Sequence, residues 1–314
     1  MIFTILTACR VQTPVPASIT PTPSSMATVT PSLTPTITPS PTPTPLVPHL
    51  DPIAILIFEN KEFTTVIGNP DMPNFNRYAR SYTLLTQHYA IRHPSLPNYI
   101  ALISGDTFGI DHTCVDCFIN APSLPDLIEA AGMIWKTYQE HMPEPCFKSE
   151  TLRYFQKHNP FLYFDAIRLD QTRCDRSVVP LDQLELDLEA QQLPDYLFIV
   201  PDICNSAHDC DLKTADGWLG IWVEKLLSNA DMAENGLIII TWDEGQGEHS
   251  CCNLPTGGGR IATILISQHV KSGFEDDTPY THYSILKTIS MAWNLPLLGH
   301  AADAETNLII APWK

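Results

Sequence analysis

A serine directly ahead of an apolar helical pattern is the first residue with evident chemical potential. It lies in the segment RHPSLPNYIALISG, which runs from Arg92 to Gly105. Apolar residues recur there at helical spacing, which predicts a helix that begins at or just after Ser95, with Pro97 in its first turn. The Ser95 hydroxyl could cap this helix, the commonest use of a serine in that position. It could also be a nucleophile, because the free backbone N–H groups at a helix N-terminus bind anions such as phosphate.

Four residues with oxygen ligands end two strongly apolar runs. Glu59 and Asn60 follow the run IAILIF, and Asp243 and Glu244 end the run GLIIITWDE. Carboxylate and amide oxygens suit a hard divalent cation such as Mg²⁺, Ca²⁺ or Mn²⁺. Without a cation, packing these acids together would raise the pKa of one of them and cost stability. We therefore expect these residues to hold one divalent ion, although acids at strand ends also cap the helices that follow.

A second polar cluster follows another apolar run. The segment PDICNSAHDC places four polar residues in a loop after a strand: Asp202, Asn205, His208 and Asp209. Histidine near carboxylates is the usual apparatus for proton transfer or phosphate contact. His158 in KHNPFLYF and His282 in THYSILKTI carry less weight, because a lone histidine is more often a structural residue.

An alternation of strands and helices must position these side chains. The segments SLPDLIEAAG, TADGWLGIWVEKLLSNA and THYSILKTISMAWNL have helical patterns. Short apolar runs that fit strands buried on both faces of a parallel sheet occupy residues 53–59, 196–202, 236–244 and 261–267. This order predicts a three-layer α/β/α sandwich with a mainly parallel central sheet. The carboxyl ends of parallel strands share one edge of the sheet, so the acids should gather there.

The composition restricts the class of protein. The chain has 314 residues, of which 44% are hydrophobic, enough for one large domain. Its formal net charge is −17, and it contains no basic stripe. We therefore expect no nucleic-acid partner, and nothing in the sequence indicates a protein partner.

The N-terminal residues resemble an export signal and a linker. Residues 1–9 end in LTAC, like a bacterial lipoprotein signal in which Cys9 becomes lipidated, although a frayed terminus with a chance cysteine is the alternative. The apolar run is too short for a transmembrane anchor. Residues 10–49 are rich in Thr, Pro and Ser and predict a disordered stalk. The catalytic domain is then expected over residues 50–314.

The remaining cysteines favour disulfides. Eight lie beyond Cys9, an even number in a chain that looks exported. Zinc is the alternative, because CVDC has the spacing of a ligand pair, but no second pair accompanies it. Adjacent Cys251 and Cys252 are not expected to pair with each other, because that linkage strains the peptide between them.

Seven motifs, taken in order, resemble those of a known family. They are FEN, HPSLPNYIALISG, KHNPFLYF, PDICNSAHD, TWDEG, GGGRIATILIS and HYSILKTI. The set is similar to the bacterial phosphoesterase family of acid phosphatases and phospholipases C, within the alkaline phosphatase superfamily. The resemblance spans Ile53 to about Leu298 and implies an alkaline-phosphatase-like fold.

The resemblance also implies roles for individual residues. Ser95 would be the nucleophile that forms a phosphoserine, and its oxygen would complete the shell of one metal ion, whose identity (Mg, Ca, Mn or Zn) stays open. The other metal ligands would be Glu59, Asn60, Asp243 and Glu244. His208 and His158 would be catalytic. The substrate phosphate would contact His93, Asn98, His282 and Asp209.

The function expected from these residues is hydrolysis of phosphate monoesters of small molecules. A phospholipase C-type phosphodiesterase acting on lipid head groups is the main alternative. The others are an inactive surface binding protein with the same fold and a secreted structural module. The chain would be exported and either secreted or tethered to a membrane through Cys9.

Overall fold

The computed structural model of the chain describes residues 1, 12–14, 16–18 and 46–314. Most of the predicted signal (residues 1–9), including Cys9, and most of the predicted stalk (residues 10–49) lie outside these residues. Val47 is already buried in the core beside Leu50, so the folded unit includes residues ahead of position 50. No helix in the described ranges combines the length and the apolar character needed to cross a membrane.

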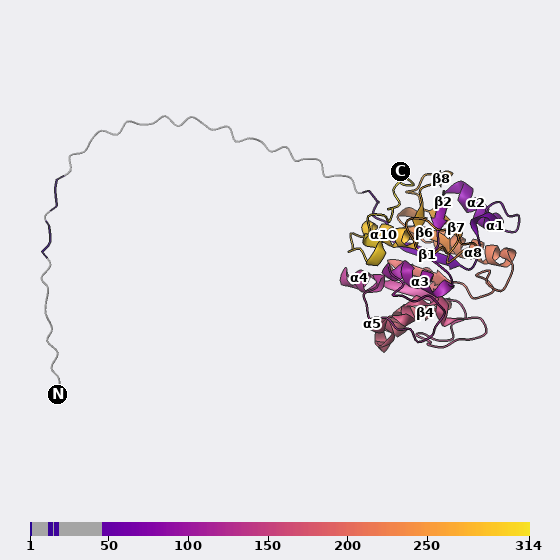
Figure 1. Ribbon diagram of the computed structural model, residues 1–314, viewed down its shortest axis with the longest axis horizontal. Coiled ribbons are helices and arrows are strands. Elements are labelled where there is room, and N and C mark those ends of the chain that lie inside the picture. Colours follow the sequence, from indigo (N-terminus) through magenta and orange to yellow (C-terminus); the bar gives the residue numbers. More distant parts are fainter. Residues whose placement is uncertain (2–11, 15, 19–45) are drawn as a thin grey trace, which may run out of the picture. The chain divides into compact units, whose positions relative to one another are not determined.

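A mixed sheet of nine strands forms the centre of residues 46–314. Its strands are β1 (Ile53–Phe58), β2 (Thr83–Tyr89), β3 (Trp135–Gln139), β4 (Val178–Pro180), β5 (Tyr196–Val200), β6 (Leu237–Trp242), β7 (Arg260–Ile266), β8 (Phe274–Asp276) and β9 (Tyr280–Thr281). The order is β4-β3-β5-β1-β6-β7-β2-β8, with β9 also paired to β2, and Figure 1 shows it from β8 at the top to β4 at the bottom. β7 runs antiparallel to both neighbours, β6 and β2, whereas the other strand pairs are parallel.

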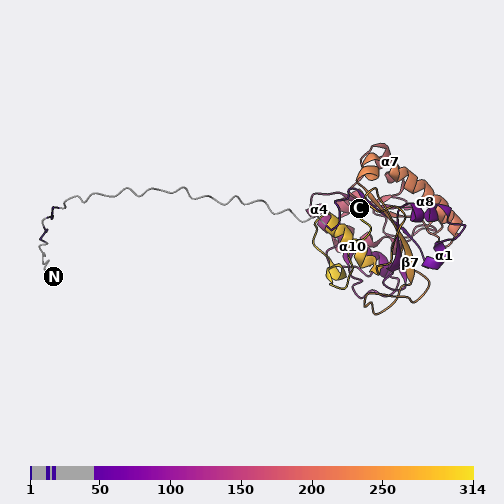
Figure 2. The same cartoon turned by 90° about the horizontal axis from the view of Figure 1, so that it is seen from above.

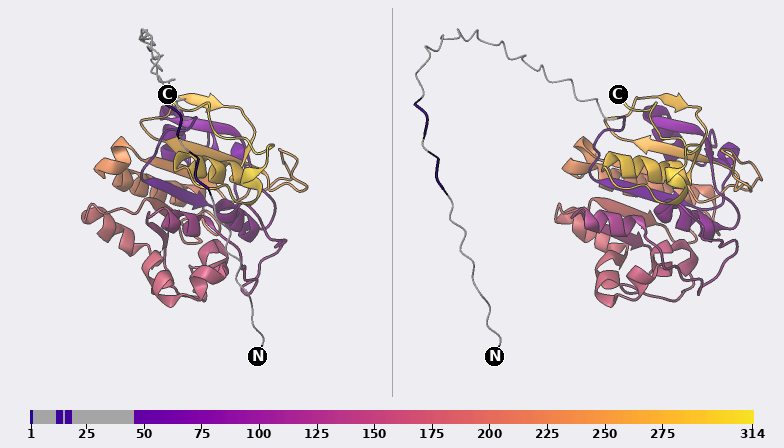
Figure 3. Two further views of the ribbon diagram at one scale, coloured as in Figure 1. Left: turned by 90° about the vertical axis from the view of Figure 1, so that its left-hand side faces the viewer. Right: turned by 60° about the vertical axis from the view of Figure 1, so that its left-hand side comes forward.

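Helices cover both faces of the sheet (Figure 2). Alternate side chains of β1 point to opposite faces, and both sets are apolar. Ile53, Ile55 and Ile57 pack with α3 (Ser95–Ser104), α4 (Leu124–Ala130) and α10 (His282–Ala292). Ala54, Leu56 and Phe58 pack with α2 (Pro73–Ser81), α7 (Asp182–Glu189) and α8 (Leu212–Leu227). Figure 3 shows the same layers from two further sides, with α10 in yellow.

The shorter elements complete the layers. They are α1 (Phe63–Val66), α5 (Asp165–Arg168), α6 (Gln171–Ser177), α9 (Ala230–Glu234) and the 3₁₀ turns η1 (Gln156–His158), η2 (Pro160–Tyr163) and η3 (Gly299–Ala302). The predicted α/β sandwich is confirmed, and each of the four apolar runs is a strand. Only the last run differs in direction, because it is β7 that lies antiparallel.

Eight cysteines form four disulfides, as predicted. Cys114 pairs with Cys117, so the zinc alternative for CVDC is wrong. The expectation that Cys251 and Cys252 do not pair is also wrong. The other six described cysteines pair among themselves, which leaves Cys251 and Cys252 as partners.

Candidate active site

The ends of two adjacent strands, β1 and β6, place the acids close together. Phe58, the last residue of β1, pairs in parallel with Trp242, the last residue of β6. The next residues, Glu59 and Asp243, therefore leave the sheet side by side. Both are fully buried, and Glu244 is 5% exposed. The predicted gathering of acids at the carboxyl edge of the sheet is thus confirmed.

Ser95 joins this edge as the first residue of α3. Its hydroxyl oxygen lies 3.1 Å from Glu59 Oε2 and 3.3 Å from Glu244 Oε1. Pro94 occupies the N-cap position, and no side chain caps the helix there. The interpretation of Ser95 as a helix cap is therefore wrong: the hydroxyl is buried and directed at the acids.

The acids repel one another in their present surroundings. Burial, followed by repulsion from Asp243, raises the pKa of Glu59 well above its ordinary value. The same two causes raise the pKa of Glu244 to about 7, and burial raises the pKa of Asp243. Asp243 Oδ1 accepts two backbone N–H bonds, but its buried Oδ2 has no hydrogen-bond partner among the described residues. An unpartnered oxygen among mutually repelling carboxylates fits a divalent cation.

Asn60 and Lys61 connect the two strand ends. Asn60 has a left-handed backbone with φ 58°, which asparagine tolerates better than most residues. Its backbone N–H donates to Asp243 Oδ1, and its side chain lies 3.4 Å from Glu59 Oε2. The ammonium of Lys61 donates to the carbonyl of Ala207 over 2.7 Å. This bond connects the acid edge, by which we mean Glu59, Asp243 and Glu244 at the carboxyl edge of the sheet, to the loop that contains His208.

Tyr99 and His158 both contact Glu59 from the α3 side of the sheet. The Tyr99 hydroxyl donates to Glu59 Oε1, and His158 Nε2 lies 3.2 Å from the same oxygen. The two rings stack with centroids 5.4 Å apart. Burial, followed by the charges of Lys157 and His208, lowers the pKa of His158 well below its ordinary value. Tyr99 was not predicted, although it lies one helical turn after Ser95 and so shares its face of α3.

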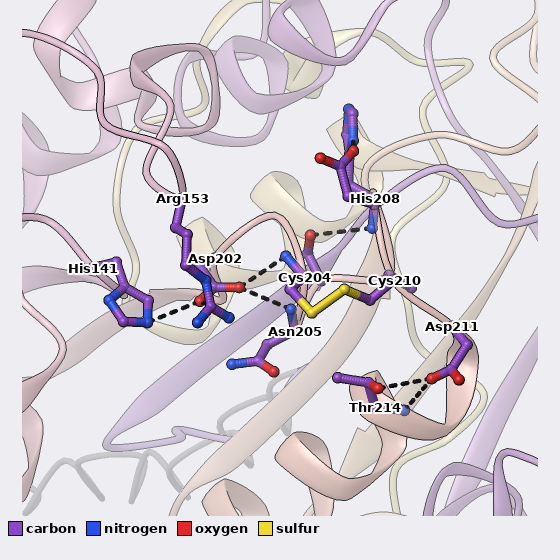
Figure 4. The surroundings of a disulfide bond; sticks show 12 residues. His141, Arg153, Asp202, Cys204, Asn205, His208, Cys210, Asp211 and Thr214 are labelled. Atoms are coloured by element: carbon purple, nitrogen blue, oxygen red, sulfur yellow. Dashed lines mark hydrogen bonds and ion pairs between the residues drawn. A yellow bond between two sulfur atoms is a disulfide. The ribbon is translucent and has the colours of Figure 1, made fainter.

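The loop after β5 carries His208 and is held by a disulfide and by hydrogen bonds to Asp202 (Figure 4). The Cys204–Cys210 disulfide closes it. Asp202 Oδ1 accepts the backbone N–H groups of Cys204 and Asn205 over 2.8 and 2.9 Å. The Ser206 carbonyl accepts the backbone N–H of Glu59, so the loop is fixed directly against the acid edge.

His208 lies where this loop meets the buried histidine. Its Nδ1 is 2.6 Å from Asp209 Oδ1, which orients the ring, and its ring centroid is 5.8 Å from that of His158. Ligand atoms of Glu59, His158 and His208 lie within 4.8 Å of one another. The structure therefore brings both predicted catalytic histidines to the acid edge.

Three residues predicted to contact the substrate have other partners. His93 bonds to Glu244 Oε2 over 2.5 Å and to the Gly247 carbonyl over 3.0 Å, so both of its nitrogens are engaged. His282 is fully buried and donates from Nε2 to the Asp243 carbonyl over 2.7 Å. Asn98 is also fully buried, and its amide bonds to the backbone of residues 91, 92 and 94. These side chains support the acids and the segment that leads into Ser95, and their contact with a substrate stays a prediction.

A second group of possible ligands lies behind the His208 loop. Glu140, His141 and Asp202 each offer an atom within 4.8 Å of the others. The guanidinium of Arg153 already lies 2.5 Å from Asp202 Oδ2, and Glu140 accepts from the amide of Asn205. Figure 4 shows Arg153 and His141 converging on Asp202. This group therefore holds the His208 loop in place, and the guanidinium of Arg153 balances the negative charge of Asp202.

The chain is similar in sequence to phosphatases of other organisms. It is 35% identical over 248 residues to an acid phosphatase of Aspergillus fumigatus, which covers 75% of this chain but 54% of the fungal protein. It is 28% identical over 256 residues to a phosphatidylinositol-3-phosphatase of Mycobacterium tuberculosis, which covers 80% of both chains. This chain thus spans about half the length of the fungal relative.

A solved structure shares the fold. A protein of the alkaline phosphatase superfamily from Vibrio parahaemolyticus superposes with a TM-score of 0.57 at 11% identity, over 82% of this chain and 71% of that one. The sequence model of the Phosphoesterase family matches residues 59–296, which begin at the first acid of the edge. The chain therefore belongs to the phosphoesterase family.

Proposed function

We propose that this protein is a metal-dependent phosphoesterase that hydrolyses phosphate monoesters of small molecules through a phosphoserine on Ser95. The observation that carries the proposal is the position of the buried Ser95 hydroxyl, within 3.3 Å of carboxylates from two strand ends. The hydroxyl has one proton to donate, so it can neutralise none of the charge on the acids around it. The same arrangement suits a nucleophile beside a cation.

The donor set defines where the cation would bind. Glu59, Asn60, Asp243 and Glu244 would hold it, together with the Ser95 oxygen. When bound, a divalent ion supplies positive charge that favours the ionised serine and the negative phosphoryl oxygens. His93 and His282 keep Glu244 and Asp243 in place from behind.

The chain's own residues then account for both half-reactions. The Ser95 oxygen forms a bond to phosphorus as the ester P–O bond breaks. The hydroxyl proton of Ser95 passes to one of the carboxylates to which it donates, and the leaving alkoxide takes a proton from His208. Water next gives a proton to His208 and attacks the phosphoserine, and the Ser95 oxygen takes its proton back from the carboxylate as phosphate leaves. His158 would bind a phosphoryl oxygen, and Asp209 would keep the His208 ring oriented.

The names of the relatives favour a monoester. An acid phosphatase and a phosphatidylinositol phosphatase both remove a terminal phosphate, whereas a phospholipase C-type reaction would cleave a diester. The test compares 4-nitrophenyl phosphate with bis(4-nitrophenyl) phosphate, using the full chain before and after exhaustive chelation. We expect turnover of the monoester that chelation abolishes and a divalent metal restores.

The contrary outcomes are distinct. Faster turnover of the diester would favour the phosphodiesterase, and no turnover of either ester would favour an inactive binding protein. Monoester turnover that survives chelation, with no metal found by elemental analysis, would remove the metal from the proposal. Ser104→Ala is the matched control for loss of the Ser95 hydroxyl, because Ser104 ends the same helix and its hydroxyl bonds only to the backbone of Ile100 and Asp106.

We further infer that the protein is exported. Four disulfides in one domain are typical of an oxidising compartment. The lipid on Cys9 and the stalk remain predictions. Mass spectrometry of the mature chain tests them: a diacylated N-terminal Cys9 in the membrane fraction supports the tether, and a soluble product with another N-terminus contradicts it.

A further inference from the structure

Lys157 places an ammonium group beside His208, and no role is yet assigned to it. Its Nζ lies 3.4 Å from His208 Nε2, and it lies 5.8 Å from the centroid of the Phe155 ring. The residue belongs to η1, directly before His158, and is half-buried. In residues 46–314 no carboxylate lies within ion-pair distance of this ammonium.

The surroundings of Lys157 differ from those of the other lysines. An ammonium group has three donors and no acceptor, so a lysine that is half-buried normally donates to an oxygen. Seven lysines, half-buried or exposed, donate to an oxygen: Lys61, Lys136, Lys148, Lys225, Lys271, Lys287 and Lys314. Lys213 has no such bond within the described ranges, but it is exposed on α8 and water can accept from it. Lys157 instead faces an imidazole nitrogen.

Two histidines, His158 and His208, lie between this ammonium and the acid edge. His158 lies between Glu59, 3.2 Å from its Nε2, and the His208 ring, whose centroid is 5.8 Å from its own. Lys157 Nζ contacts His208 Nε2, and both residues are half-buried. The site therefore has two parts. The acids and Ser95 form one, and the side chains of His158, His208 and Lys157 form the other.

We propose that Lys157 is a further substrate-binding residue, whose ammonium binds a non-bridging oxygen of the substrate phosphate beside the ester oxygen that His208 protonates. The inference rests on the proposed function, because it requires a phosphate ester at Ser95. Two donor nitrogens 3.4 Å apart can both point at the oxygens of one phosphate group. The phosphate would provide the oxygen acceptors that Lys157 lacks, and a charged donor makes such a bond stronger than a neutral one.

A purely structural role makes a different prediction. If Lys157 served only to pack on Phe155, methionine would replace it well, because it keeps an unbranched apolar chain. If it binds phosphate, arginine should replace it in part, because arginine keeps the charge and the donors. The pair Lys157→Met and Lys157→Arg therefore separates charge from packing, and Lys157→Gln gives a second neutral variant if the methionine variant does not fold.

The experiment measures phosphate binding without turnover. Inorganic phosphate is titrated into the metal-loaded full chain by calorimetry, and KM and kcat for 4-nitrophenyl phosphate are measured in parallel. Loss of one charge-assisted bond, about 1.5–3 kcal/mol, should weaken phosphate binding and raise KM by about 10- to 100-fold in Lys157→Met and Lys157→Gln. Lys157→Arg should lose less, and the exposed-lysine control Lys213→Met should match the wild type, as should all melting temperatures.

Phosphate affinity and KM at wild-type values in both neutral variants would overturn the role of Lys157 and leave the proposed function intact. The role of Lys157 would also be overturned if Lys157→Met kept the wild-type phosphate affinity and KM while Lys157→Arg lost them. A wild-type protein that binds no phosphate and hydrolyses no monoester would instead overturn the proposed function, and this inference with it.

Discussion

Replacement of Asp243 by asparagine should stabilise the metal-free protein and destabilise the metal-bound one. Asparagine keeps the shape of the side chain, and its oxygen can still accept the backbone N–H groups of Asn60 and Glu244, now bonded to Asp243 Oδ1. Its amide nitrogen would replace the unpartnered Oδ2 and could donate to Glu59 or Ser95. The substitution thus removes a repelling charge and supplies a donor at the same place.

The magnitude follows from the packing of the acids. Two unit charges about 4 Å apart interact by about 4 kcal/mol at an effective dielectric constant of about 20. Partial protonation of Glu59 and Glu244, whose pKa values are raised, reduces this cost in the wild type. We expect Asp243→Asn to stabilise the metal-free protein by about 1–3 kcal/mol, or about 2–10 °C in melting temperature. A metal at about 100 times its Kd should stabilise the wild type by about 2.7 kcal/mol, but the variant much less.

Thermal unfolding of the full chain with chelator and with added metal tests this reversal. The control is Asp216→Asn, since the buried Asp216 accepts backbone N–H groups of Asn74 and Phe75, far along the chain from the acid edge. This control should lower the melting temperature equally under both conditions. A lower melting temperature of Asp243→Asn than of the wild type in chelator would show that repulsion among the acids does not destabilise the metal-free protein.

Three further substitutions test the supports of the site. Tyr99→Phe should destabilise the protein by about 1.5–3 kcal/mol in urea unfolding, because a buried carboxylate loses a donor; an unchanged midpoint would show that Glu59 does not need it. Asn98→Ala should cost at least about 2 kcal/mol and lower phosphatase activity through the segment that leads into Ser95, whereas the control Asn307→Ala, which loses only a solvent-exposed hydrogen bond, should cost almost nothing; equal effects would contradict this. Replacing Cys204 and Cys210 with serine should cost about 2 kcal/mol and lower kcat, since the disulfide closes the loop of His208; unchanged kcat would separate the loop from catalysis.

The sequence was sufficient to predict the strands that carry the site. The four apolar runs are short and continuously apolar, which is typical of strands buried on both faces of a sheet. The polar residues that follow β1, β5 and β6 lie at the edge of the sheet that carries the site. β2 and β3 were not predicted, because TLLTQHY and WKTYQ mix polar and apolar residues. The antiparallel direction of β7 also has no local signal, since it depends on the path of the chain between strands.

The supporting side chains were harder to predict than the acids. Glu59 and Asp243 are placed by neighbouring strand ends, a relation that follows from sheet topology. The contacts of Tyr99 and Lys157 depend on how α3 and η1 pack against that edge, which no spacing in the sequence determines. The pairing of Cys251 with Cys252 follows from which other cysteines are near each other, so it required the whole fold.

Trapping of the covalent intermediate tests the central role of Ser95 most directly. The metal-loaded wild type is mixed with a phosphate monoester, quenched in acid during turnover, digested and analysed by mass spectrometry. We predict a phosphate on the peptide that contains Ser95, none in Ser95→Ala, and loss of turnover by several orders of magnitude in that folded variant. Turnover at the wild-type rate in Ser95→Ala, or phosphate trapped on another residue, would contradict the mechanism.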